Sequence, residues 1–372
     1  MSSTLPACLT PFTIRGVGFR NRIVVSPMCQ YSSADGYAGD WHRAHHARLA
    51  LSGVGGAVVE ATAVTADGRI TPGCLGIWQD AHIEPLRRLT DIWHAAGAPV
   101  GIQLAHSGRK GSAAPPHEGA APLANGPRAA EAWPTLAPSA IAQDRGWPVP
   151  QAMSEQQIGA TLDAFGAAAE RAVAANFDFV EIHAAHGYLI HSFLSPLSNQ
   201  RDDAWGGDAA RRMRFALEVA RTVRRRVPTG MPVFARLSCI DADEGVSGLE
   251  ETLQVVRALQ AAGVDLIDCS AGGIAGPSGR APVPLGPAYL VPTARRIQRE
   301  TGVPTMATGL IDTPQLAESA IASGEVSLLA IGRQLLVEPS FAYRAAVELG
   351  HPSPEDLLPA QYAFFIRRKR AR

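Results

Sequence analysis

The sequence predicts an α/β fold, a (β/α)8 (TIM) barrel. Eight short apolar runs recur along the 372 residues, and most are continuous, as in parallel strands that are buried on both faces. Helix-like segments separate most of these runs, and eight such units within about 350 residues match the size of this barrel. The runs cover residues 22–28, 56–62, 99–106, 177–184, 231–238, 265–271, 304–309 and 327–333.

Capping signals delimit the helices between these runs. Residues 154–157, Ser-Glu-Gln-Gln, have the pattern of a capping box at a helix start. Thr313 followed by Pro314 resembles a helix cap with proline in the first turn. Glycines at 97, 263 and 302 stand where helices should end. The predicted helices are 83–96, 154–175, 209–226, 249–262, 289–301 and 313–323.

A doubly wound open sheet is the competing fold. It usually has fewer strands and a G-x-G-x-x-G turn after the first of them, and the sequence has no such turn there. No linker divides the chain, so residues 1–372 are expected to form a single barrel domain with a C-terminal arm from about 352 to 372.

One connection is unusually long. The stretch from about 107 to 153, rich in Ala, Pro and Gly, follows the third run and precedes the next helix. Loops of this length usually serve as lids, so we expect a cap over the barrel mouth that includes a small hairpin. A floppy surface insertion is the alternative.

Composition excludes some classes of partner. Lys and Arg number 34, as do Asp and Glu, so no charge excess indicates nucleic acid or a membrane surface. The sequence has neither a run of about eighteen apolar residues nor a signal peptide. Its five cysteines lack C-x-x-C spacing, and we expect them to be reduced in the cytoplasm. The basic run 367–372 is expected to be a solvated terminus.

Two imidazoles and a phenol cluster where the fourth run ends, at His183, His186 and Tyr188. Gly187 permits the turn that these side chains need in order to converge. Two neutral imidazoles can each donate one N–H to a single oxygen, and a phenol can deliver a proton to a carbon. The set therefore suits polarising a carbonyl and protonating beside it. Ordinary hydrogen bonds at a strand end are the alternative.

The last two runs end in residues that suit phosphate binding. Active sites in such barrels lie at the carboxyl ends of the strands. Gly309 and Gly332 would let backbone N–H groups approach a phosphate closely. Arg333 would supply a forked donor to the same group. Structural turn glycines beside a surface arginine are the alternative.

Two further residues indicate the charge and the shape of the rest of the expected ligand. Arg236 needs an anionic partner, and no acidic residue ends a neighbouring strand except Glu60. The side-chain amide of Gln103 offers a donor and an acceptor to the edge of a heterocycle. The implied cofactor is phosphorylated, planar and able to carry negative charge, and flavin mononucleotide (FMN) fits all three.

On these residues, the chain resembles the Old Yellow Enzyme family of FMN-dependent ene-reductases. It is most similar to the branch that includes xenobiotic reductases and thermophilic-like members. The resemblance extends from residue 12 to residue 362. The matching stretches are 12–16 (FTIRG), 21–23 (NRI), 26–29 (SPMC), 103–110 (QLAHSGRK), 183–189 (HAAHGYL), 193–201 (FLSPLSNQR) and 331–333 (IGR).

The resemblance implies where FMN would lie. Its phosphate would rest on Gly309, Gly332 and Arg333, and the flavin would extend across the barrel mouth. Gln103 would meet the pyrimidine edge of the flavin, and Arg236 would stabilise its anionic reduced form. The residues that flank the isoalloxazine ring would be Ser26, Pro27, Met28, Cys29 and Ala61.

The resemblance also implies a reaction of two half-reactions at one site, without a metal ion. NADPH or NADH delivers a hydride to flavin N5, and a small electron-poor alkene then accepts it at the β-carbon. His183 and His186 would bind the carbonyl or nitro oxygen of that alkene. Tyr188 would protonate the α-carbon, and Tyr31 would line the substrate pocket.

The chain departs from the family at its C-terminus. Many relatives carry an arginine there that enters the pocket of the neighbouring subunit, and Gln361 and Tyr362 are not followed by one. Phe364 or Phe365 would cross the interface instead, in a homodimer or a dimer-based tetramer. Thr308 stands where the xenobiotic reductases have tryptophan, which implies a roomier pocket.

Three other functions remain as alternatives. A dienoyl-type FMN reductase could use the same site, although the iron–sulfur cysteine cluster of the large reductases is missing. A metal-dependent barrel hydrolase would need carboxylate or lysine ligands at the strand ends, and a flavin storage protein would not need the His/His/Tyr set. The cluster of His42, His45 and His46 is expected in the first barrel helix, where packing explains it better than metal binding.

Overall fold

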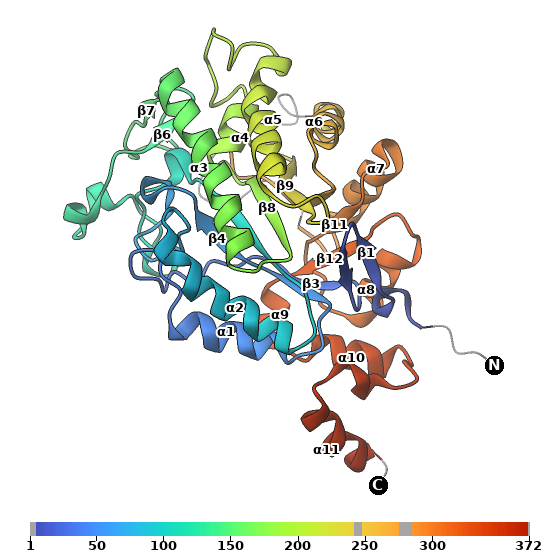
Figure 1. Ribbon diagram of the computed structural model, residues 1–372. Coiled ribbons are helices and arrows are strands. Elements are labelled where there is room, and N and C mark those ends of the chain that lie inside the picture. Colours follow the sequence, from blue (N-terminus) through green and yellow to red (C-terminus); the bar gives the residue numbers. More distant parts are fainter. Residues whose placement is uncertain (1–4, 242–247, 275–284, 371–372) are drawn as a thin grey trace.

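Eight parallel strands close into a barrel, as the sequence predicts (Figure 1). The computed structural model describes residues 5–241, 248–274 and 285–370. Each barrel strand pairs with the next barrel strand along the chain, and the last pairs with the first. The strands are β3 (Ile23–Val25), β4 (Gly56–Ala63), β5 (Val100–Ala105), β8 (Phe179–Ala184), β9 (Val233–Ile240), β10 (Leu266–Ala271), β11 (Thr305–Ala307) and β12 (Leu328–Ile331).

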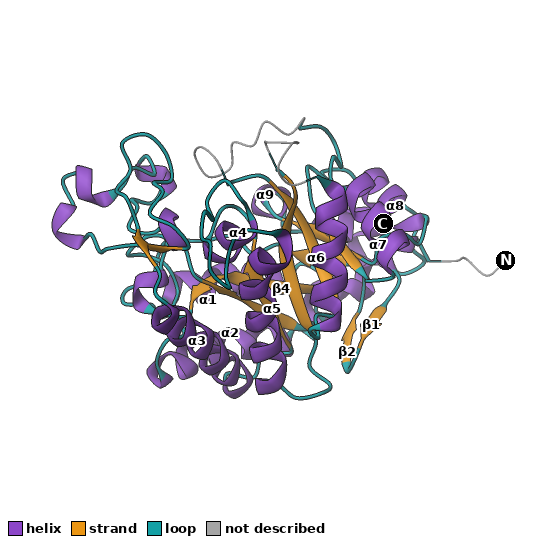
Figure 2. Ribbon diagram, turned by 90° about the horizontal axis from the view of Figure 1, so that it is seen from above, coloured by secondary structure: helices purple, strands orange, loops and turns teal. Residues whose placement is uncertain are grey.

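Helices surround the strands (Figure 2), and their ends follow the predicted capping signals. The Ser154 hydroxyl accepts from the N–H of Gln157, whose side chain accepts from the N–H of Ser154. Thr313 caps the helix that begins at Pro314. The main helices are α1 (Asp40–Ala50), α2 (Ile83–Ala95), α3 (Glu155–Ala174), α5 (Ala209–Arg226), α6 (Leu249–Ala261), α7 (Val291–Thr301) and α8 (Pro314–Ala322), and the shorter α4 (Leu189–Leu194) and α9 (Arg333–Val337) follow β8 and β12.

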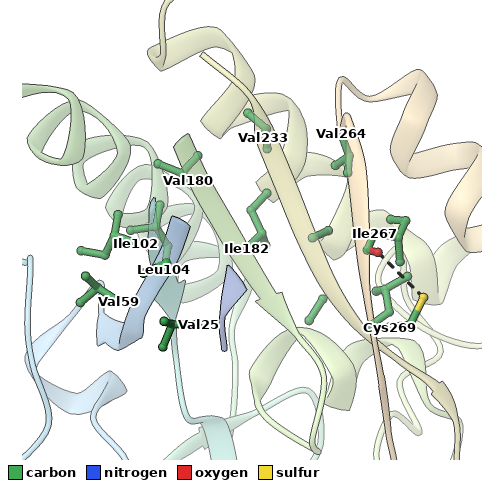
Figure 3. Close-up of a cluster of buried hydrophobic side chains, with 14 of the residues drawn as sticks. Val25, Val59, Ile102, Leu104, Val180, Ile182, Val233, Val264, Ile267 and Cys269 are labelled. Carbon is green, nitrogen blue, oxygen red and sulfur yellow. Dashed lines mark hydrogen bonds between the residues drawn. The ribbon is translucent and has the colours of Figure 1, made fainter. Parts of the chain in front are cut away.

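Successive side chains on each strand alternate between the helices and the barrel interior. Figure 3 shows part of the outer set, such as Val180 and Ile182 of β8, in the large core between strands and helices. The inner set begins with an apolar layer, closed by the antiparallel hairpin of β1 (Phe12–Ile14) and β2 (Val17–Phe19). That layer contains Val24, Val58, Phe179, Phe234, Leu266, Met306, Leu328 and Ala330.

The long connection after β5 contains four short 3-10 turns and a two-stranded sheet, β6 (Leu136–Ala137) and β7 (Gln151–Ala152). The two strands are parallel, so this pair is not a hairpin, whereas Ala113 and Pro122 of the same connection form an antiparallel bridge, as in the expected small hairpin. The physical reason for the parallel pairing is the intervening segment 138–150, which is long enough for the chain to return and run in the same direction, whereas a tight turn would reverse it.

The helix α10 (Phe341–Glu348) precedes the C-terminal arm, and the arm contains α11 (Ala360–Arg370), which extends away from the barrel (Figure 1). Tyr362, Phe364 and Phe365 of α11 are exposed. Residues 371 and 372 of the basic tail lie outside the described residues. Among the described helices, none is both long and apolar enough to span a membrane.

Candidate active site at the carboxyl ends of the strands

A cavity of ≈ 480 Å³ opens at the carboxyl ends of the strands. This volume is within the range of small-molecule and cofactor sites. Seven of the predicted cofactor residues line it: Ser26, Pro27, Met28, Arg236, Gly309, Gly332 and Arg333. Ser270, Tyr289 and Thr308 also line it, and the first two were not predicted from the sequence.

One end of the cavity is built by the turns after β11 and β12. Gly309 has φ +112°, and a Cβ added there would lie 2.8 Å from the ring of Tyr289. Only glycine fits that position, and it leaves the backbone open to the cavity. Burial raises the pKa of Tyr289, while the charges of Arg333 and Arg236 lower it, so both guanidinium groups act on this space. Asp312 is the acidic residue in the lining. The open backbone at Gly309 and the guanidinium groups of Arg333 and Arg236 together fit a bound phosphate.

The predicted His/His/Tyr set converges at the end of β8. The ring centroids of His183 and His186 lie 5.1 Å apart, and those of His183 and Tyr188 lie 4.9 Å apart. Burial, with the charge of Arg236 as a further cause, lowers the pKa of both histidines well below the ordinary value. Both imidazoles are therefore neutral. His183 Nδ1 accepts the N–H of Ala185 at 3.3 Å, so its proton is on Nε2.

The turn that carries His186 is held in a rare backbone conformation. His186 has φ 61° and Gly187 φ 74°, both in the left-handed region. The buried side-chain nitrogen of Lys110 donates to the His186 carbonyl at 2.6 Å and to the Gly273 carbonyl at 2.5 Å. Ser238 Oγ accepts the N–H of His186 at 2.9 Å. These contacts fix the turn, and the sequence alone did not indicate this role for Lys110 or Ser238.

The imidazole of His186 has a partner that was not predicted from the sequence. Its Nε2 lies 2.6 Å from Oγ of Ser270, on β10. If the hydroxyl donates to Nε2, the proton of the neutral ring is on Nδ1. The alternating polar residues Asp268 and Ser270 in the sixth run were the available signal, since alternation marks side chains that point into the barrel.

Cys29, Tyr31 and Ala61 form a second group beside the cavity, outside its lining. Tyr31 has φ 51°, and its phenol lies close enough to the thiol of Cys29 for each group to affect the pKa of the other. The backbone of Ala61 acts on the same thiol and favours a lower pKa for it. Burial and then the charge of Glu60 raise the pKa of Cys29 well above its ordinary value, so it is a thiol. The pKa of Tyr31 is raised chiefly by burial and is also affected by Tyr188, which places the two phenols in one environment.

Gln103 and Arg236 lie below the cavity mouth, in contact with carboxyl groups. Gln103 Nε2 donates to Oε1 of Glu181 at 2.7 Å. Arg236 Nε lies 3.2 Å from Oδ2 of Asp268. The expectation that no acidic residue except Glu60 stands near Arg236 is therefore wrong. It considered only residues at strand ends, whereas Asp268 lies inside β10, in register with Arg236.

The clustered histidines lie in α1, as expected. His42 Nε2 lies 3.4 Å from a carboxylate oxygen of Glu60, and His46 Nδ1 accepts the indole N–H of Trp93 at 3.1 Å. Across the described ranges, no group of three or more His, Cys, Asp or Glu side chains is arranged to hold a metal ion.

Comparison with known proteins identifies the family. The profile of the NADH:flavin oxidoreductase / NADH oxidase family matches residues 8–351. The chain is 42% identical to an NADH:flavin oxidoreductase of Gibberella zeae, over 92% of this chain and 85% of that protein. It is also 42% identical to an NADPH dehydrogenase of Geobacillus thermodenitrificans, over 92% of this chain and 94% of that protein. The chain belongs to this family.

Membership of the NADH:flavin oxidoreductase family makes the chain an oxidoreductase with FMN as its cofactor. Solved structures with 24% identity share the fold. An Old Yellow Enzyme homologue from Zymomonas mobilis has a TM-score of 0.76 over 93% of this chain and 94% of its own. A 2-naphthoyl-CoA reductase has a TM-score of 0.81 over 95% of this chain, which spans 53% of that longer chain. The resemblance to the Old Yellow Enzyme family is confirmed.

Proposed function

We propose that this FMN oxidoreductase uses NADPH to reduce the C=C bond of α,β-unsaturated carbonyl or nitro compounds. The observation that carries the proposal is the convergence of two neutral imidazoles and one phenol, with His183 5.1 Å from His186 and 4.9 Å from Tyr188 between ring centroids. Two neutral N–H donors suit an oxygen that gains negative charge, and a phenol suits delivery of a proton nearby.

The chain's own residues would hold the cofactor as the cavity lining suggests. Gly309, Gly332 and Arg333 would bind the phosphate at the end formed by β11 and β12. Arg236 would face the flavin from below, and Gln103, fixed by Glu181, would present its amide to the pyrimidine edge. The ring would be flanked by Ser26, Pro27, Met28, Cys29 and Ala61. Bound there, FMN supplies hydride chemistry.

Substrate activation would depend on the histidine tautomers. His183 would donate from Nε2 and His186 from Nδ1, because Nδ1 of His183 and Nε2 of His186 are already engaged. Together they would withdraw electron density from the β-carbon of the alkene. Tyr188 would protonate the α-carbon, and Tyr31 would orient the substrate from the side of Cys29.

The choice of NADPH follows from relatives that are named NADPH dehydrogenases, such as that of Geobacillus thermodenitrificans. NADH is the alternative reductant, since the Gibberella zeae relative is named NADH:flavin oxidoreductase. Comparison of kcat/KM for the two nicotinamides with one alkene distinguishes them.

A substrate panel tests the reaction itself. The FMN-loaded enzyme is incubated without oxygen with NADPH and cyclohexenone, a nitroalkene, a dienoyl thioester or saturated cyclohexanone, and the products are identified. We expect the first two to be reduced at C=C and cyclohexanone to remain unchanged. Reduction of the dienoyl thioester alone would favour the dienoyl-type alternative, and reduction of none of them would refute the proposal.

We also propose a homodimer-based assembly in the cytoplasm, formed through the C-terminal arm. Phe364 is 53% and Phe365 70% exposed on α11, which extends away from the barrel (Figure 1). Neighbouring exposed aromatic side chains are typical of protein interfaces. Light scattering should give the molar mass of a dimer or of a multiple of a dimer. Replacement of both phenylalanines by serine should shift that mass toward the monomer.

A further inference from the structure

The barrel interior carries a layer of polar side chains directly below the cavity. Gln103, Glu181, Arg236 and Asp268 come from neighbouring strands β5, β8, β9 and β10, and each is at most 8% exposed. The last three stand two residues after Phe179, Phe234 and Leu266 of the apolar layer. The interior of such a barrel is usually filled by branched apolar side chains, so buried ionisable groups here need a physical reason.

The layer has two carboxyl groups for one guanidinium. Arg236 Nε lies 3.2 Å from Oδ2 of Asp268, and the Gln103 amide donates to Oε1 of Glu181. In the part of the chain that the structure describes, neither Oε2 of Glu181 nor either carboxylate oxygen of Asp268 has a hydrogen-bond partner, and of these two carboxyl groups Asp268 is the one in an ion pair with Arg236. An ionised carboxylate with an unpartnered buried oxygen is costly. Arg236 can neutralise only one of the two carboxylates.

The charge of this layer is therefore set by a single proton. With Asp268 ionised, a protonated Glu181 leaves the layer neutral, and an ionised Glu181 leaves it with one negative charge. Arg236 also lines the cavity, so the electrostatic potential in the cavity depends on whether Glu181 is protonated. We propose that Glu181 is the charge-balancing residue of the flavin site, which binds one proton when the cofactor gains negative charge and releases it when that charge leaves.

The electrostatic environment of Glu181 agrees with this role. Burial and then the charge of Asp268 raise the pKa of Glu181 to about 8, against the opposing effects of Arg236 and the Gln103 hydrogen bond. The charged groups that face it are thus Asp268 and Arg236, from β10 and β9. His183, farther along β8, is neutral. Negative charge added above Arg236 would raise the pKa of Glu181 further.

Proton and electron counts balance in this scheme. A hydride passes from the reduced nicotinamide, which is oxidised, to FMN, which is reduced, and this adds one negative charge above the layer. The Glu181 carboxylate then forms an O–H bond with a proton from solvent. When the hydride leaves for the oxidant, Glu181 returns that proton to solvent. Above the pKa of Glu181 in the oxidised enzyme, where its carboxylate is ionised, reduction therefore takes up one extra proton.

Potentiometry of the holoenzyme tests the proposal without turnover. The midpoint potential of bound FMN is measured with equilibrating dyes from about pH 6.5 to about pH 9.5. For a two-electron couple, a tenfold change in proton activity shifts the potential by about 29.6 mV for each proton taken up. One extra proton therefore steepens the fall of the midpoint potential with pH from about 30 to about 60 mV per pH unit. We expect this steepening above about pH 8 in the wild type and its absence in Glu181→Gln.

Glu181→Gln resembles the protonated residue and keeps an acceptor for Gln103, so it should fold and bind FMN, as thermal unfolding and FMN fluorescence would show. Asp268→Asn removes the neighbouring negative charge, which lowers the pKa of Glu181 and should move the break in slope to lower pH. Glu170→Gln, at an exposed ion pair with Arg226, is the matched control and should leave the curve unchanged.

The wild type alone provides a second measurement. The reduced-minus-oxidised infrared spectrum at about pH 9 should show a new band of a protonated carboxylic acid. A wild-type slope without a break, no such band, or a break that persists in Glu181→Gln would each overturn the proposal.

Discussion

The ring of Tyr188 is nearly perpendicular to that of His183, with 4.9 Å between centroids and 78° between planes. His183 is neutral with its proton on Nε2, and Tyr188 follows the left-handed turn at His186 and Gly187. The strand and the turn after it thus place a neutral imidazole and a phenol side by side. The proposed reaction needs both groups, each in its own role.

Replacement of Tyr188 by phenylalanine should slow alkene reduction by about 100-fold or more, the usual contribution of a positioned acid. Reduction of the enzyme by NADPH should be nearly unchanged, because the phenol is not needed for that step. Stopped-flow measurement of the two half-reactions separates the effects. Equal slowing of both would contradict the assignment of Tyr188 as the proton donor.

Replacement of Ser270 by alanine should weaken substrate activation without removing the imidazole. Ser270 lies 2.6 Å from Nε2 of His186, and if its hydroxyl donates to that nitrogen, the proton of His186 is no longer held on Nδ1 once the hydroxyl is removed. We expect kcat for cyclohexenone to fall by about 10-fold, the cost of one weakened hydrogen bond in the transition state. Ser270→Thr, which keeps the hydroxyl, should restore most of the rate. Failure of threonine to differ from alanine would contradict the tautomer argument.

Replacement of Arg333 by alanine should weaken FMN binding. A charge-assisted hydrogen bond contributes about 1.5–3 kcal/mol, which corresponds to about 10- to 100-fold in the Kd of FMN. Fluorescence titration of the apoprotein measures it. Arg299→Ala, at an exposed position on α7, is the matched control and should leave the Kd unchanged. Equal Kd values for the two variants would place the phosphate elsewhere.

Acid should destabilise the fold through buried neutral histidines. Burial, with neighbouring His45 and His42, lowers the pKa of His46 from 6.5 to about 3. The unfolded chain therefore binds a proton below pH 6.5 that the folded chain does not, and stability is lost as pH falls from 6.5 toward 3. Each such histidine lowers the free energy of unfolding by about 1.4 kcal/mol for each pH unit in this window.

The test compares the wild type with His46→Gln in urea unfolding at about pH 7 and about pH 5. Glutamine can accept from the Trp93 indole, so the variant should fold. Its loss of stability between the two values should be smaller than that of the wild type. An equal loss in both proteins would mean that His46 is not among the groups responsible.

The strands and helices could be predicted because local signals decide them. The continuous apolar runs marked all eight barrel strands, and the capping residues Ser154 and Thr313 marked helix starts. The cap could not be predicted in the same way. Its strands β6 and β7 have two residues each, too few for any periodic pattern, and their parallel pairing depends on contacts distant in sequence.

The site was predictable where one short stretch holds it, as at His183, His186 and Tyr188. Residues that act across strands were missed: Ser270 at His186, Lys110 at the His186 carbonyl, and Asp268 at Arg236. Their roles follow from strand register and from the path of a loop, which a single sequence does not state. The polar alternation within the fourth and sixth runs was the one available signal.

The most direct test of the proposed function is anaerobic reoxidation of the reduced, FMN-loaded enzyme by cyclohexenone in a single turnover. We predict that the absorbance of oxidised flavin returns, that one cyclohexanone forms for each flavin, and that Tyr188→Phe slows this return. If cyclohexenone and a nitroalkene leave the flavin reduced while oxygen reoxidises it, alkene reduction at this site is contradicted.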